Sequence, residues 1–299
     1  MTHLAPYPGT QSARRAVALL KAFGSGGPRS LTQIARRVRL NKATVFRLLT
    51  ALESEGLLTR EAKSGAYRLG PEAIALGWQA IRSNDLVRTV RPELEALARR
   101  TRDTATLEIL SGRQVLILDE VTAGRRVEID SSLGSRWPAH ATSTGKVLLA
   151  HLPAAELRRI LARPLRRFTD RTVTGRRILA QQLAEARRRG FAEAVEELEE
   201  GFVAVAAPVF RHDGVVVAAI SVGGPSARIP PDRLPDLAAR VVRHAARASR
   251  ALGYRRPRAV DPSLKPQASS LGLAKHGIPR RPVAASRRNK AVRGKGPRP

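Results

Sequence analysis

The sequence predicts an α+β protein in which an N-terminal winged helix-turn-helix is followed by an antiparallel α+β domain. Two observations support this prediction. Three short amphipathic segments precede a small hairpin in the first 70 residues, and strand pairs alternate with helices from about residue 85 onward. A third observation is that the formal charge of +29 is concentrated at the two ends of the chain.

The N-terminal unit is predicted from spacing and capping. Apolar residues recur at helical spacing over residues 12–23. A second helix begins after Ser30, because Ser30 and Gln33 form a capping-box pattern. A third begins after Asn41, a favourable N-cap residue, and ends before Gly56. The short break between the last two helices is typical of a helix-turn-helix, and residues 57–69, with Gly65 in the turn, predict a wing.

The middle of the chain mixes strands and helices. A connecting helix is expected over residues 71–84 and another over 87–101. The remaining elements share clear periodicity or turn signals. Strands are expected at 104–110, 114–121, 125–130, 201–210 and 215–224, and helices at 144–151, 154–162, 174–189 and 230–252. This order favours an antiparallel α+β domain over a Rossmann fold.

These elements divide the chain into four parts. We expect a DNA-binding-type winged helix-turn-helix over 10–70, a linker helix over 71–85, a second domain over 86–254 and a disordered basic tail over 255–299. The tail has many Pro, Arg, Lys, Ser and Ala residues and no period. It either adds nonspecific phosphate contacts or is an unselected flexible extension.

Charge and composition restrict the class of protein. Residues 1–70 hold 12 Lys/Arg against 3 Asp/Glu, and residues 255–299 hold 13 against 1. Such basic ends predict attraction to a polyanion, with nucleic acid favoured over a membrane surface. The absence of cysteine excludes disulfides and thiolate chemistry. Without a secretory signal or an apolar run of 18 residues, the chain is expected to be cytoplasmic, with no membrane span.

The outward face of the third helix carries residue types that contact duplex DNA. Recognition helices present their N-terminal residues to base edges in the major groove. Arg47 and Lys42 can reach guanine or phosphate, Thr44 can bond a base edge or phosphate, and Phe46 can press on a thymine methyl. Ala43 is small enough to allow close approach. The alternative is a solvated helix face with one exposed aromatic residue.

The wing supplies further candidates for phosphate or minor-groove contacts. These are Arg60, Lys63, Ser64 and Arg68. The alternative interpretation is an exposed basic hairpin without a DNA contact. Arg36 and Arg37 on the second helix either touch the DNA backbone or keep that helix soluble.

Patterns of enzyme active sites are incomplete in this sequence. Ser143 and Lys146 match S-x-x-K, but no S-D-N or K-T-G partner occurs. The six His residues are scattered without metal-ligand spacing, so neither a metal site nor a cofactor is expected. The acids at 196, 197, 199 and 200 are interpreted as a solvated edge. We therefore expect no catalytic residues and no enzymatic activity.

Three separated segments carry a resemblance to a known family, namely "LTQIARRVRLNKATVFRLLTALESEGLLTREAKSGAYRLG", "HATSTGKVLLAHLP" and "EELEEGFVAVAAPVFRHDGVVVAAISVGGPSARI". Together they resemble the IclR-type bacterial transcriptional regulators. The resemblance covers about residues 10–254. It implies a winged helix joined by a helix to a GAF-like effector domain, and a homodimer or dimer of dimers on operator DNA. One departure lies before the third helix, with Arg39 where Gly is usual and Asn41 where Pro is common.

The resemblance also implies an effector pocket. By position it would be lined by Ser143, Thr144, Ala194, Phe202, Ala204, Ser221 and Gly223. Family members that bind small carboxylates tend to have an acid at 194, Cys at 204 and Ser at 223. Losing these polar groups removes hydrogen-bond partners for a small anion. We expect a larger, more hydrophobic or aromatic effector, or a degenerate pocket.

The combined prediction is a sequence-specific, effector-responsive transcriptional regulator that binds double-stranded DNA. An alternative is an architectural, largely sequence-tolerant DNA-binding protein whose affinity comes from the basic ends. The sequence does not identify the effector, the operator or the target genes. It also does not decide whether the protein represses or activates transcription, or whether it is a dimer or a tetramer.

Overall fold

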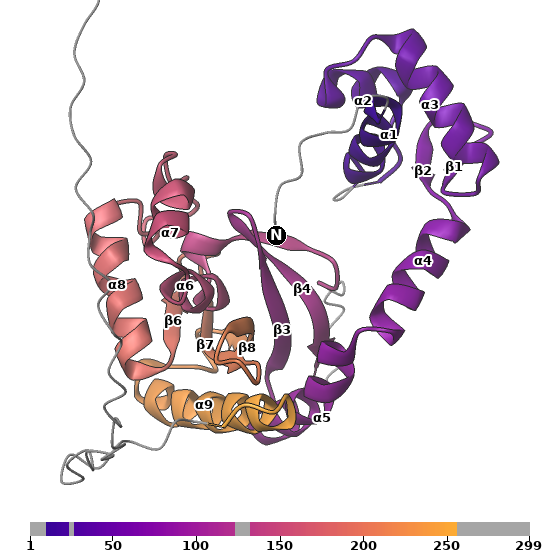
Figure 1. Ribbon diagram of the computed structural model, residues 1–299. Helices are drawn as coiled ribbons and strands as arrows, with labels where there is room; N and C mark the ends of the chain where they lie inside the picture. The colour runs from indigo at the N-terminus through magenta and orange to yellow at the C-terminus, as the bar shows by residue number, and fades with distance from the viewer. Residues whose placement is uncertain (1–9, 24–26, 123–131, 256–299) are drawn as a thin grey trace, which may run out of the picture. The chain divides into compact units, whose positions relative to one another are not determined.

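The N-terminal elements form the predicted winged helix-turn-helix. The computed structural model describes residues 10–23, 27–122 and 132–255. Its first elements are three helices and a two-stranded hairpin (Figure 1), namely α1 (Gln11–Lys21), α2 (Leu31–Val38), α3 (Lys42–Ser54), β1 (Leu58–Arg60) and β2 (Tyr67–Leu69). Leu19, Ile34, Val45 and Leu49 are fully buried in their shared core. The helical spacing in the sequence therefore predicted the correct inward faces.

The turn between α2 and α3 is built by capping interactions. Ser30 and Gln33 form the predicted capping box, with the Gln33 amide donating to Ser30 Oγ over 3.3 Å. The Thr44 amide donates to Asn41 Oδ1 over 2.7 Å, so Asn41 caps α3 as predicted. Arg39 ends α2 in the left-handed conformation, with φ of 56°. This conformation costs an L-residue roughly 1–2 kcal/mol, which explains why glycine is the usual residue there.

The wing is a short antiparallel hairpin. Thr59 pairs with Arg68, and Gly65 takes φ of +66° in the turn. A single bridge between Arg29 and Tyr67, which the sequence did not predict, adds a third segment to the hairpin.

Two helices follow the wing. The first, α4 (Pro71–Arg82), has no buried residue. The second, α5 (Asp85–Thr101), begins two residues before the predicted start, because Asn84 Oδ1 accepts hydrogen bonds from the amides of Leu86 and Val87.

The C-terminal part is built on one antiparallel sheet of six strands. Their order is β5-β4-β3-β8-β7-β6, and each neighbouring pair is antiparallel. The strands are β3 (Thr104–Ser111), β4 (Gln114–Val121), β5 (Arg136–Pro138), β6 (Ala192–Val195), β7 (Phe202–Phe210) and β8 (Val216–Pro225). The two outermost strands, β5 and β6, were missed by sequence reasoning because each is too short to show a period. The predicted strand at 125–130 and residues 256–299 of the predicted tail lie outside the described residues.

Helices cover both faces of this sheet (Figure 1). The helices are α6 (Ser143–Ala150), α7 (Ala154–Leu161), α8 (Arg176–Arg189) and α9 (Leu234–Ala251), with 3₁₀ turns η1 (Ala139–Ala141) and η2 (Pro231–Arg233). One core joins α5 and α9 to the sheet, and it includes Val205 and Ala207. The opposite core joins α6, α7 and α8 and includes Ala206. This alternation along β7 is the period of two expected for a strand buried on both faces.

Candidate functional site

The predicted DNA-contact residues of α3 lie on the protein surface. Lys42, Ala43, Phe46 and Arg47 are exposed, while Thr44 is half-buried. Phe46 is 50% exposed, a large value for an aromatic side chain. Lys42 and Arg47 form no ion pair or side-chain hydrogen bond with any described residue. Both cations can therefore meet phosphate or a base edge without breaking an internal contact.

The side chains of the wing residues differ in whether they contact other residues of the hairpin. Lys63 and Arg68 are exposed. Ser64 Oγ donates to Glu61 Oε2 over 2.8 Å and accepts from the Ala66 amide, so it shapes the turn. The Arg60 guanidinium lies 5.7 Å from the centre of the Tyr67 ring. Among these candidates, Lys63 and Arg68 are the two whose side chains form no hydrogen bond, ion pair or ring contact with a described residue.

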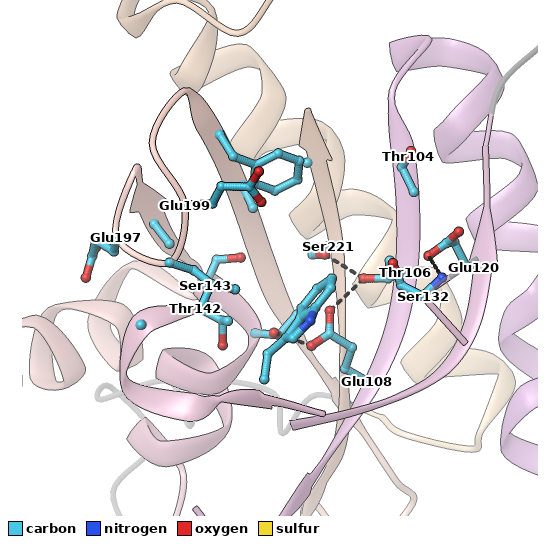
Figure 2. Close-up of a pocket in the computed structure, with 18 residues that line it drawn as sticks. Thr104, Thr106, Glu108, Glu120, Ser132, Thr142, Ser143, Glu197, Glu199 and Ser221 are labelled. Carbon is cyan, nitrogen blue, oxygen red and sulfur yellow. Dashed lines mark hydrogen bonds between the residues drawn. The ribbon is translucent and has the colours of Figure 1, made fainter. Parts of the chain in front are cut away.

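All seven residues predicted for the effector pocket line one cavity of about 220 Å³ (Figure 2). Ser143 and Thr144 come from the start of α6, Ala194 from β6, Phe202 and Ala204 from β7, and Ser221 and Gly223 from β8. Residues nearly 80 positions apart in the sequence thus meet at the same wall.

Phe202 covers the wall at Gly223. A Cβ atom added to Gly223 would lie 2.8 Å from Phe202 Cζ and 3.2 Å from Ala204 Cβ. A serine at this position would therefore require the Phe202 ring to move. This contact accounts for a glycine beside a phenylalanine here, and the part of the wall around Gly223 is formed by the apolar side chains of Phe202 and Ala204, with Ser221 of β8 as a polar neighbour.

The opposite wall contains a buried carboxylate that sequence reasoning missed. Glu108 on β3 is 1% exposed and lines the cavity. Thr106 Oγ1 donates to its Oε1 over 2.7 Å, and Thr144 Oγ1 donates to its Oε2 over 2.6 Å. Ser221 Oγ lies 2.7 Å from Thr106 Oγ1 (Figure 2), and it is the donor because the Thr106 proton goes to Glu108. The expected loss of polar groups therefore describes only one side of the cavity.

Burial controls the ionisation of Glu108. Removal of the carboxylate from water raises the pKa of Glu108, the Thr144 and Thr106 hydroxyls oppose this effect, and the charge of Glu120 adds to it.

The alternation of residues along β3 could have predicted this polar wall from the sequence. Thr104, Thr106 and Glu108 occupy alternate positions of one strand, opposite the buried Ala105 and Leu107.

A second buried charge supports the cavity from behind. Lys146 of α6 is paired with Glu197, and the two side chains are 2% and 8% exposed. The interpretation of the acids at 196–200 as a solvated edge is wrong for Glu197, because Lys146 holds it inside. Desolvation lowers the pKa of Lys146, and the carboxylate of Glu197 opposes this shift. No hydrogen bond in the described structure joins Lys146 to Ser143, so the S-x-x-K match has no base aimed at its serine.

Gly145 permits the close approach of α6 and η1. A Cβ atom there would lie 2.1 Å from the Ala139 carbonyl oxygen. The adjacent His140 donates a hydrogen bond from Nε2 to the Arg166 carbonyl oxygen over 2.9 Å. Burial lowers the pKa of His140. The close packing of α6 on η1 thus explains the glycine in "STGK".

None of the helices in the described ranges is both long and apolar enough to cross a membrane.

The fold, the exposed basic face of α3 and the cavity of the second domain are those of a helix-turn-helix regulator with a site for a small ligand. The family model for the IclR helix-turn-helix domain matches residues 12–62, and the model for the C-terminal domain of bacterial transcriptional regulator IclR matches residues 78–250. The chain belongs to the IclR family of DNA-binding transcriptional regulators.

Relatives match over most of their length. KdgR, a transcriptional regulator of Escherichia coli, is 31% identical over 244 residues, which cover 81% of this chain and 93% of KdgR. The transcriptional repressor IclR of E. coli is 30% identical, with 81% of this chain and 90% of the repressor covered. Neither relative is named as an architectural DNA-binding protein, so the comparisons do not support that alternative.

Solved structures agree with the fold. The IclR regulator from Alicyclobacillus acidocaldarius has a TM-score of 0.73 at 30% identity, covering 81% of this chain and 98% of the regulator. An IclR homolog from Microbacterium hydrocarbonoxydans, solved in complex with 4-hydroxybenzoate, has a TM-score of 0.68 at 28% identity, covering 81% and 99%.

Proposed function

We propose that this regulator inserts the N-terminal half of α3 into the major groove of an operator. The observation that carries the proposal is the exposed, unpaired Lys42 and Arg47 on a helix that Asn41 caps and a well-packed core supports. Arg47 contacts a base edge or phosphate, and Thr44 and Phe46 contribute on the same face. Lys63 and Arg68 of the wing contact the DNA backbone.

Arg47→Ala tests this assignment. The operator is first selected from genomic fragments retained by the protein, and affinity is then measured by fluorescence anisotropy at fixed salt. Losing one specific contact costs about 1–3 kcal/mol, or roughly 5- to 150-fold in affinity. The melting temperature should be unchanged, because Arg47 has no partner in the described structure.

Arg158→Ala is the matched control, since Arg158 is an exposed arginine of α7 with no ion pair among the described residues. It should bind operator as the wild type does. Wild-type affinity in Arg47→Ala would refute the placement of α3 on DNA.

The proposal includes an effector that binds the cavity of the second domain. Support comes from the convergence of the seven predicted residues on one cavity and from the relative solved with 4-hydroxybenzoate. We divide the chain into a DNA-binding unit over 10–70, a linker over 71–85 and an effector domain over 86–254. An effector acts by changing the spacing of two DNA-binding units through the linker, since that spacing must match the half-sites.

We also propose that the protein works as a homodimer and that α4 contributes to its interface. Ile74, Leu76 and Trp78 are 72%, 55% and 60% exposed, and no α4 residue is buried. Ile74 and Trp78, four residues apart, form an apolar stripe on one face of the helix, and an exposed stripe of this kind is typical of an interaction surface. Sedimentation velocity measures the assembly state, and a monomer at micromolar concentration would contradict the proposal.

A further inference from the structure

The charged residues that line the cavity within the described part of the chain are all acidic. Four glutamates line it, namely Glu108, Glu120, Glu197 and Glu199, whereas its described lining residues include no lysine, arginine or histidine. Lys146 neutralises Glu197 from outside the cavity. The other three carboxylates form no ion pair with any described residue. Among the described residues, a ligand in this cavity therefore meets acidic side chains without basic ones.

Glu108 is held in a fixed orientation at the wall. Its two oxygens accept hydrogen bonds from Thr106 and Thr144, and the Thr106 hydroxyl is in turn held by Ser221. An ionised carboxylate has about four acceptor positions, so two remain after these bonds. A buried carboxylate without a counter-ion is unfavourable, and a nearby ammonium group would relieve that cost with a charge-assisted hydrogen bond.

The remaining walls suit the body of such a ligand. Trp137 and Phe202 line the same cavity, as do Ala141, Ala194 and Ala204. Aromatic faces attract cations, and small apolar side chains contact hydrocarbon. The volume of about 220 Å³ is below the ~300–1,000 Å³ of sites for drug-sized ligands, which favours a small molecule.

We propose that the effector is a small amine, with its ammonium group on Glu108 and an apolar or aromatic body between Trp137 and Phe202. This inference rests on the proposed function of the cavity as an effector site. It gives the ligand the opposite charge from an aromatic acid such as the 4-hydroxybenzoate of the solved relative.

Three probes of similar size separate the possibilities. Calorimetry on the full-length protein at neutral pH compares 2-phenylethylamine, 3-phenylpropionate and 2-phenylethanol. The amine should bind at least about tenfold more tightly than the carboxylate, because a hydrogen bond to a charged partner in a buried site has this magnitude. Equal or tighter binding of the carboxylate overturns the proposal, as does a failure of the amine to bind.

Two matched variants locate the preference. Glu108→Gln keeps the size of the side chain and removes its charge, and it should lower the amine-to-carboxylate affinity ratio at least about tenfold. Glu199→Gln makes the same charge change at an exposed position of the cavity and should change the ratio less than about threefold. An equal effect of both substitutions would mean that Glu108 does not select the ligand. Thermal unfolding of each variant establishes that it is folded.

The same samples distinguish this inference from the proposed function. Operator affinity is measured by fluorescence anisotropy with each probe present. If the amine binds through Glu108 and operator affinity does not change, the cavity selects amines as inferred, but the proposal that it is an effector site is refuted. If the carboxylate binds more tightly and changes operator affinity, the effector role stands and the amine assignment fails.

Discussion

Replacing Lys146 by methionine tests how far one buried ion pair supports the cavity. Lys146 and Glu197 are almost fully buried, and the Lys146 ammonium also lies 3.5 Å from the Glu193 carbonyl oxygen. The second oxygen of Glu197, Oε2, is buried without a hydrogen-bond partner in the described part of the chain. Lys146→Met keeps the length of the aliphatic stem and removes the only charge that compensates this carboxylate within the described residues.

The expected loss of stability follows from this geometry. Removing one partner of a buried ion pair costs about 3–5 kcal/mol, because the remaining charge is left without compensation. Lys146→Met with Glu197→Gln leaves no buried charge at this pair of positions, so the double variant should recover at least about 2 kcal/mol of the loss. Arg158→Met, an exposed change in the same domain, should cost less than about 0.5 kcal/mol.

Urea unfolding measures these differences. The sequence contains two tryptophans, Trp78 and Trp137. In a Trp78→Phe background the fluorescence reports Trp137 alone, which lines the cavity. A loss below about 1 kcal/mol for Lys146→Met, or a double variant no more stable than the single one, would refute the argument.

Two further predictions concern assembly and pH. Trp78→Glu should raise the dimer dissociation constant at least about tenfold in sedimentation velocity, because it places a charge on the exposed apolar stripe of α4. Gln79→Glu is the control. An unchanged dissociation constant for Trp78→Glu would show that α4 is not part of the dimer interface. Burial raises the pKa of Glu108 above its ordinary value of 4.5, so the folded state holds this proton more strongly than the unfolded chain. The stabilisation is present below that value and lost as pH rises through the folded pKa. Urea unfolding should therefore show the wild type losing stability relative to Glu108→Gln as pH rises, and a difference that does not vary with pH would contradict this.

The sequence by itself determined the winged helix-turn-helix. Its signals are local: Ser30 with Gln33, Asn41 before α3, and the spacing of Ile34, Val45 and Leu49. Capping and helical periodicity act over three to eight residues, so they can be recognised without knowing the rest of the fold. The exposed Lys42 and Arg47 followed from the same periodicity.

Only the tertiary structure decided the chemistry of the cavity. Glu108 meets Thr144, 36 residues away, and Thr106 meets Ser221, 115 residues away. The pairing of β3 with β8 and the packing of α6 create both contacts, and neither leaves a local mark in the sequence. Likewise, Glu197 is buried because Lys146 reaches it from another element, although its acidic neighbours indicated solvent. Patterns along the chain specify which faces of a helix or strand are buried, whereas the partner of a buried charge depends on which elements the fold brings together.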